Sequence, residues 1–254
     1  MLYEKKGSGH PIIFLPGLFA GGWIWDLIIE SVIERGYSAI VFKEPIPVTF
    51  EKNHKKIINV LDQVIDSCDE QPYLVGNSLG ALIALHYSSL NTSRVKGIVM
   101  SGAPGQIENE AGVSLSDLRT GNIKYASVLM GNVYLDKSKV PQRGIDEISR
   151  IFSDDEIFKS IVRWLSFSRK YDVPKILSET TIPIHFIWGR EDIITPVAPW
   201  QVLANKLSHV SMSIIDNCGH SPMLELPQTF VEKLFSQIDH NLVSENKYQF
   251  SQSA

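Results

Sequence analysis

The chain has 254 residues, of which 44% are hydrophobic, enough for one globular domain with a full core. Its formal net charge of −4 leaves no basic surface of the kind that binds nucleic acid. No apolar run approaches the roughly 20 residues of a membrane span, and no apolar signal core follows the N-terminus. We therefore expect a cytoplasmic protein without a membrane span. Cys68 and Cys218 match no metal-binding spacing and are expected to be free thiols.

Short apolar segments alternate with amphipathic ones along most of the chain. The pattern predicts strands at 12–15, 37–42, 73–75, 95–100, 184–188 and 211–215. It predicts helices at 25–34, 57–67, 79–90, 199–207 and 227–238, the last of which starts with a proline. Short buried strands that alternate with helices indicate an α/β fold with a doubly wound, mostly parallel sheet.

The alternation stops between about residues 103 and 181. Helical patterns occupy 115–130 and 157–167, and no clear strand is visible there. The stretch is short and has no linker composition at either end, so we expect a helical lid rather than a separate helical domain. Such a lid would cover the carboxyl ends of the strands, where open α/β sheets bind ligands. The expected organisation is a core of 1–102 and 182–240, a lid of 103–181 and a polar tail of 241–254.

The pentapeptide Gly76-Asn77-Ser78-Leu79-Gly80 follows a short apolar run and precedes a stretch of good helix formers. It has the G-x-S-x-G form of a nucleophile elbow, in which a sharp strand-to-helix turn exposes the serine hydroxyl. The bare pattern arises by chance in about one chain of this length in ten. The order of strand, turn and helix favours an elbow over an ordinary glycine-rich loop, and predicts Ser78 as a covalent nucleophile.

A serine hydroxyl needs a base to take its proton, and the base needs a carboxylate to orient it. His220 is the candidate base, because its loop is shaped by Gly219 and Pro222 and follows the strand expected at 211–215. The remaining histidines fall in helices, in a strand or in polar surroundings, and are expected to be structural or solvated: His10, His54, His86, His185, His209 and His240.

Asp192 is the candidate carboxylate, in a loop that also follows a buried strand. Room remains between Asp192 and His220 for one helix and one strand. Glu191 is a rival for the same role, and the alternative for Asp192 is a helix cap or turn residue.

The tetrahedral intermediate of such a reaction needs two donors for its oxyanion. We expect one from the backbone N–H of Leu79, directly after the nucleophile. The other is expected from the loop after the first buried strand, with the N–H of Leu18 as first choice and Phe19 as second. Trp23 and Trp25, which follow in the chain, are expected to pack in the core rather than contact substrate.

The chain resembles the α/β-hydrolase fold family over nearly its whole length. The motifs that carry the resemblance are Leu15-Pro16-Gly17-Leu18, the pentapeptide around Ser78, Gly189-Arg190-Glu191-Asp192 with Pro196, and Gly219-His220. The order Ser, Asp, His is also that of the family. Residues 21–25 further resemble the plant methylesterase and hydroxynitrile lyase branch.

The chain departs from the family pattern in two places. Pro16 stands where many members have histidine, which affects the hydrogen bonding of the oxyanion loop. Only residues 2–5 precede the turn at 7–9, so one early strand of the family's usual eight is expected to be missing.

The resemblance implies a serine hydrolase that uses neither a metal nor an organic cofactor. The apolar lid favours a small hydrophobic ester or thioester as substrate. Carbon–carbon bond hydrolysis, a lyase reaction and acyl transfer use the same residues, and a ligand receptor on a hydrolase scaffold is a further alternative. The sequence leaves the oligomeric state open.

Overall fold

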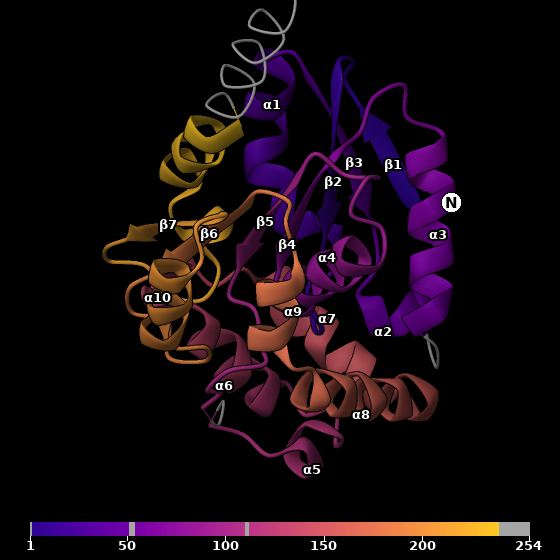
Figure 1. Cartoon of the computed structure of the whole chain (residues 1–254). Coiled ribbons are helices and arrows are strands. Elements are labelled where there is room, and N and C mark those ends of the chain that lie inside the picture. Colours follow the sequence, from indigo (N-terminus) through magenta and orange to yellow (C-terminus); the bar gives the residue numbers. More distant parts are fainter. Residues whose placement is uncertain (1, 51–53, 110–111, 239–254) are drawn as a thin grey trace, which may run out of the picture.

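The computed structural model describes residues 2–50, 54–109 and 112–238. A seven-stranded sheet crosses this part of the chain in the order β1-β3-β2-β4-β5-β6-β7 (Figure 1). Its strands are β1 Tyr3–Lys6, β2 His10–Leu15, β3 Tyr37–Phe42, β4 Tyr73–Asn77, β5 Gly97–Ser101, β6 Ile184–Gly189 and β7 Val210–Ile215. All neighbouring pairs are parallel except β1 with β3. The predicted α/β fold with a mostly parallel sheet is therefore confirmed.

The strand β1 was not among the predicted strands. Tyr3–Lys6 is only partly buried, and it pairs antiparallel with the outer side of β3. A turn with positive φ at Gly7 (73°) and Gly9 (99°) brings the chain back into β2. The described residues hold seven strands in one sheet.

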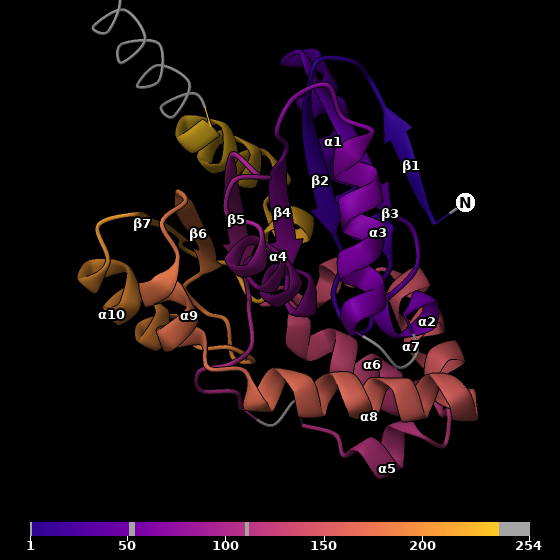
Figure 2. The same cartoon turned by 45° about the vertical axis from the view of Figure 1, so that its right-hand side comes forward.

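Helices cover both faces of the sheet (Figure 2). They are α1 Asp26–Glu34, α2 Ile46–Thr49, α3 His54–Asp66, α4 Leu79–Leu90, α10 Val197–Lys206, α11 Pro222–Glu225 and a last helix at 227–238. Tyr87 on α4 donates a 2.6 Å hydrogen bond to Asp62 on α3. The last helix packs near α1, with the rings of Trp25 and Phe230 6.1 Å apart. The strands β2 to β6 are almost wholly buried between these layers, as their continuous apolar runs predict.

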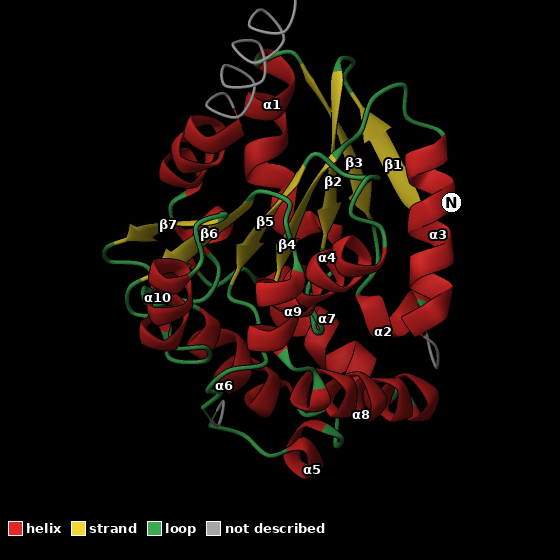
Figure 3. Ribbon diagram, in the orientation of Figure 1, coloured by secondary structure: helices red, strands yellow, loops and turns green. Residues whose placement is uncertain are grey.

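The chain between β5 and β6 forms helices and, in its described part, no strand. These helices are α5 Leu115–Leu118, α6 Ile123–Val133, α7 Gln142–Ser153, α8 Asp155–Lys170 and α9 Val173–Glu179, with a 3-10 turn η2 at Lys137–Lys139. They lie at the end of the sheet toward which the arrows of β2, β4 and β5 point (Figure 3). We call this segment the helical insertion. Its exact domain boundaries stay a prediction, and the expected polar tail lies outside the described residues.

The helix expected at 115–130 is broken into α5 and α6. Gly121 has a φ of 66°, which continues no right-handed helix, and the side chain of Asn122 then caps α6 by accepting from the N–H of Lys124. The helix expected at 157–167 is longer than predicted, because Asp154 caps it and it runs to Lys170. Within the described ranges, no helix has both the length and the apolar character of a membrane span. Cys68 and Cys218 are free thiols.

Candidate active site

Ser78 stands between the last residue of β4 and the first residue of α4. Its φ of 53° and ψ of −123° lie in a region that residues with a side chain rarely adopt. A Cβ on Gly76 would collide with the backbone of Gly80, and a Cβ on Gly80 would collide with the carbonyl group of Leu15 at the end of β2. The two glycines therefore allow the close packing that holds Ser78 in a strained turn.

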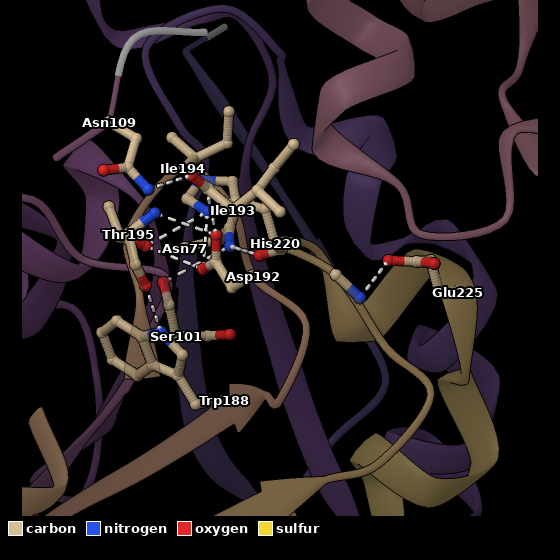
Figure 4. A network of polar contacts seen from close by, with 11 residues as sticks. Asn77, Ser101, Asn109, Trp188, Asp192, Ile193, Ile194, Thr195, His220 and Glu225 are labelled. Atoms are coloured by element: carbon tan, nitrogen blue, oxygen red, sulfur yellow. Dashed lines mark hydrogen bonds and ion pairs between the residues drawn. The ribbon is translucent and has the colours of Figure 1, made fainter. Parts of the chain in front are cut away.

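His220 and Asp192 form a buried pair, although 28 residues separate them in the chain. The ring Nδ1 of His220 lies 2.9 Å from Oδ2 of Asp192, and the two residues are 6% and 4% exposed. The other oxygen, Oδ1, accepts the backbone N–H groups of Ile194 and Thr195, both at 2.9 Å. The Thr195 hydroxyl donates to Oδ2 at 2.7 Å (Figure 4). Every contact of this carboxylate is thus with a donor or with the histidine ring.

These donors keep Asp192 ionised. Burial acts to raise the pKa of its carboxyl group, but the His220 ring and the hydrogen bonds from His220 and Thr195 outweigh it, so the pKa lies below its ordinary value. An ionised carboxylate beside Nδ1 fixes the ring with its proton on that nitrogen, which leaves Nε2 as a proton acceptor.

Glu191, the rival acid, points elsewhere. Its Oε2 accepts the backbone N–H of Cys218 at 2.9 Å, so it supports the loop that leads to His220 and does not contact the ring. The geometry favours Asp192 over Glu191 as the partner of His220.

The backbone of His220 is held at both ends. Its N–H donates to the carbonyl of Val133 at the end of α6, at 2.9 Å. Its carbonyl accepts a 3.3 Å hydrogen bond from Nδ2 of Asn77, which also lies 3.3 Å from the carbonyl of Ser101 (Figure 4). The ring rests against Gly102, where an added Cβ would come within 2.8 Å of Cε1. These contacts restrict both the position and the orientation of the imidazole.

Ser78 and His220 line one pocket between the sheet and the helical insertion. The pocket is narrow, with a cavity volume of about 60 Å³. The polar residues that line it are Asn77, Ser78, His220 and Ser221. The rest of the wall is apolar and includes Leu18, Phe19, Ile24, Leu129, Met130, Val133, Ile148 and Leu224. The insertion therefore supplies a large share of the surface that a substrate would meet.

The backbone groups expected to bind an oxyanion lie beside the serine. A Cβ added to Gly17 would be 3.4 Å from the Cβ of Ser78, so the loop after β2 passes directly beside Ser78. Leu18 lines the pocket. Leu79 is the first residue of α4, where N–H groups have no acceptor within the helix. Both positions suit the expected role, which stays a prediction.

Comparisons with known proteins agree with this architecture. Residues 12–233 match the model of the alpha/beta hydrolase family. The chain belongs to the alpha/beta hydrolase family. It is 24% identical to 2-hydroxy-6-oxo-6-(2'-aminophenyl)hexa-2,4-dienoic acid hydrolase of Metapseudomonas resinovorans, an alignment that covers 92% of this chain and 86% of the relative. It is 22% identical to pimeloyl-[acyl-carrier protein] methyl ester esterase of Nitrosomonas europaea, over 90% of this chain and 95% of the relative.

Solved structures show the same fold. A serine hydrolase involved in carbazole degradation, the CarC enzyme, superposes with a TM-score of 0.75 at 22% identity. The match covers 93% of this chain and 93% of that one. At this identity the likeness supports the fold alone. The substrate of this alpha/beta hydrolase has to be inferred from its own residues.

The other histidines of this alpha/beta hydrolase lie away from the pocket. His185 is placed between two serine hydroxyls of β7, His10 lies beside Glu70, His209 beside the carbonyl of Leu177, and His54 and His86 pack against Phe167. His240 is outside the described residues. No group of three or more potential metal-binding side chains occurs in the part of the chain that the structure describes.

Trp23 and Trp25 are buried, and neither lines the pocket. The ring nitrogen of Trp23 donates to Oε2 of Glu147 at 2.6 Å, and the same oxygen accepts the N–H of Gly21 at 2.9 Å. Glu147 lies on α7 of the insertion, so this contact joins the loop after β2 to the helices above it. The packing role expected for both tryptophans agrees with these contacts.

Sequence reasoning missed two residues that support the pair. Thr195 donates twice to Asp192, and its hydroxyl lies 3.3 Å from Nδ1 of His220. Its spacing of three residues after an aspartate is typical of a side chain-capped turn and could have identified it. Asn77 occupies a variable position of the elbow motif, and no local signal indicates that its amide reaches His220.

Proposed function

We propose that this alpha/beta hydrolase cleaves a carboxylic ester or thioester of a small hydrophobic substrate through an acyl-enzyme on Ser78. One observation carries the proposal. Ser78 and His220 line the same apolar pocket, while the far side of the His220 ring is held by the buried carboxylate of Asp192. A nucleophile, a base and an orienting acid in this order are the parts that serine acyl transfer requires.

In the first half of the reaction, Nε2 of His220 takes the proton of the Ser78 hydroxyl, and Oγ attacks the substrate carbonyl. The resulting oxyanion is stabilised by the N–H groups of Leu18 and Leu79. The imidazolium formed on His220 is stabilised by Asp192. As the intermediate collapses, His220 donates its proton to the departing alcohol or thiol, and the acyl group stays on Ser78.

In the second half, water replaces the leaving group. His220 takes a proton from the water, the hydroxide attacks the acyl carbonyl, and the same donors bind the second oxyanion. Collapse returns the proton from His220 to Oγ and releases the carboxylic acid. Besides the chain and the substrate, these steps need only one water molecule to balance.

The walls of the pocket support a hydrophobic substrate. Apart from His220, the residues that line it carry no ionisable side chain. A charged group near the scissile bond would lose its hydration there without gaining a partner. The pocket therefore favours an apolar acyl or aromatic group.

A cytoplasmic location, expected from the sequence, stays a prediction.

Carbon–carbon bond hydrolysis is the second candidate. The observation that favours it is the relative named as a hydrolase of a 2-hydroxy-6-oxo-hexa-2,4-dienoic acid, to which 92% of this chain aligns. The same side chains would serve both reactions. A lyase, an acyltransferase and a ligand receptor also share the scaffold, but no contact in the described structure favours them.

The test is hydrolysis of p-nitrophenyl esters from acetate to long acyl chains by wild type, Ser78→Ala and a control, Ser236→Ala. Ser236 is exposed on the last helix and donates only to the carbonyl of Lys233. We expect turnover by wild type and the control, and a loss of about 10⁴-fold or more in Ser78→Ala. The same proteins are assayed with a 2-hydroxy-6-oxo-hexa-2,4-dienoate.

The outcomes separate the candidates. Ester turnover that depends on Ser78 and exceeds turnover of the dienoate establishes the proposal. Preference for the dienoate, again dependent on Ser78, establishes the second candidate. Ester turnover that persists in folded Ser78→Ala refutes the acyl-enzyme. Stable ligand binding with turnover far below roughly 1 s⁻¹ would instead indicate a receptor.

A further inference from the structure

Glu225 is a buried acid close to the candidate active site that the mechanism above does not use. It is the last residue of α11, five positions after His220, and only 4% of its surface is exposed. An unpaired carboxylate is costly to bury, so its partners indicate why it is there.

Both carboxylate oxygens of Glu225 accept backbone N–H groups. Oε1 accepts from Gly219, the residue before His220, at 2.7 Å (Figure 4). Oε2 accepts from Leu135 at 2.9 Å and from Asp136 at 3.3 Å, both in the turn after α6. One carboxylate thus joins the loop that carries His220 to the helical insertion.

Two further hydrogen bonds connect the same pair of segments. The N–H of His220 donates to the carbonyl of Val133, at 2.9 Å. The ammonium of Lys139 donates to the backbone carbonyl of Glu225, at 3.1 Å. The segments also touch directly, because a Cβ added to Gly219 would lie 2.8 Å from the N of Leu135 and 2.9 Å from the carbonyl oxygen of Val133.

The charge of Glu225 is stabilised by these backbone dipoles rather than by a salt bridge to its carboxylate. Burial outweighs the N–H groups of Gly219, Asp136 and Leu135 and the nearby Lys139 ammonium, so the pKa of Glu225 lies above its ordinary value. An amide side chain could not accept from all three N–H groups, because its nitrogen is only a donor.

We propose that Glu225 is a positioning residue for His220, which fixes the histidine loop against the turn after α6. The inference rests on the proposed function. Through this bond the helical insertion would take part in catalysis as well as cover the pocket. Met130 and Val133 of its helix α6 also line the pocket. A substrate that packs against α6 therefore contacts the element to which the His220 backbone is bonded.

The experiment compares wild type, Glu225→Gln, Glu225→Asp and a charge-matched control, Glu232→Gln, on the best p-nitrophenyl ester. Glu232 is exposed on the last helix. Turnover is measured well below each variant's melting temperature, and kcat is calculated per folded molecule. We expect Glu225→Gln to lose on the order of 10- to 100-fold in kcat, since small misplacements of a catalytic group have effects of this size. KM should change by less than about threefold.

Glu225→Asp keeps the charge with a shorter side chain, and we expect it to show the same kcat-specific loss at a smaller size. It also replaces Glu225→Gln if that variant does not fold. A double-mutant comparison tests whether Glu225 affects turnover through His220. If Glu225 acts through His220, Glu225→Gln should change the residual activity of His220→Ala by less than about twofold.

Folded Glu225 variants with kcat within about twofold of wild type would overturn the inference, as would an equal loss in the His220→Ala background. A lowered melting temperature with unchanged kcat would show that Glu225 serves stability alone. The proposed function fails separately, since in that case Ser78→Ala and His220→Ala would retain turnover.

Discussion

Replacing Asp192 by asparagine tests the orientation of His220 without removing volume. The asparagine Oδ1 can keep both backbone hydrogen bonds from Ile194 and Thr195, each 2.9 Å long in the wild type. The amide nitrogen then takes the place of Oδ2, which lies 2.9 Å from Nδ1 of His220. Because that nitrogen is a donor, Nδ1 must become an acceptor, and the ring proton moves to Nε2, the nitrogen that the proposed mechanism needs as an acceptor.

A histidine with its proton on Nε2 cannot take the serine proton. We expect kcat/KM to fall by about 10⁴-fold, which corresponds to about 5.4 kcal/mol of lost transition-state stabilisation. The cost to folding should be much smaller. Hydrogen bonds to charged groups contribute about 1.5–3 kcal/mol each, but the amide still donates to Nδ1 and to the Thr195 hydroxyl. The variant should therefore stay folded at assay temperature.

The assay is kcat/KM on the best p-nitrophenyl ester, with thermal unfolding measured in parallel. Glu191→Gln is the matched control, because Glu191 accepts only the N–H of Cys218 and does not reach the ring. We expect its activity to stay within about threefold of wild type. If Asp192→Asn keeps more than about a tenth of the activity, or if Glu191→Gln is the impaired variant, the assignment of the acid is wrong.

Two further predictions concern stability. Gly80→Ala should lower the free energy of unfolding by about 1–3 kcal/mol or more, since its Cβ would collide with the end of β2. Gly131→Ala on α6, whose nearest neighbour would be 4.0 Å away, should in contrast be neutral or stabilising in thermal melts, and equal effects would contradict the steric argument. Burial, with a smaller contribution from Lys233, lowers the pKa of His185 to about 4. The unfolded chain therefore binds more protons than the native one below the ordinary histidine pKa of about 6.5. Stability should fall with decreasing pH by up to about 1.4 kcal/mol per unit between these values. A His185→Gln variant with an unchanged pH slope in denaturant titrations would contradict this.

The strands and helices that could be predicted from the sequence are those in which the hydrophobic pattern of the segment itself indicates the structure. The central strands are continuous apolar runs, because helices bury both of their faces. β1 was missed because Tyr3–Lys6 is mostly polar, and only its pairing with β3 makes it a strand. The break between α5 and α6 had a local signal in Gly121 and Asn122, which the amphipathic pattern around them concealed.

The candidate site likewise contains residues that a local sequence signal predicts and residues that only the fold brings together. Ser78, Asp192 and His220 each stand in a loop with a local signature directly after a strand. Thr195 supports Asp192 from three positions away, but other supporting residues act over long sequence distances. Asn77 contacts the carbonyl of His220 across 143 positions, and Glu225 contacts the N–H of Leu135 across 90. Contacts of this kind depend on how separate strands, loops and the insertion come together in the fold, and no spacing in the sequence encodes them.

The family can be predicted from the sequence because its motifs are local, whereas the substrate cannot, because the pocket lining depends on packing. The proposed nucleophile, base and acid lie in loops that follow strands of the sheet, and their chemistry would be common to ester and carbon–carbon bond hydrolysis. Helices α6 and α7 add four residues of the insertion to the pocket lining, namely Leu129, Met130, Val133 and Ile148. Met130 fits there because Gly144 on α7 has no side chain, and an added Cβ would come within 2.7 Å of the Met130 methyl group. The shape of this part of the pocket thus depends on a contact within the insertion, away from the motifs around Ser78, Asp192 and His220.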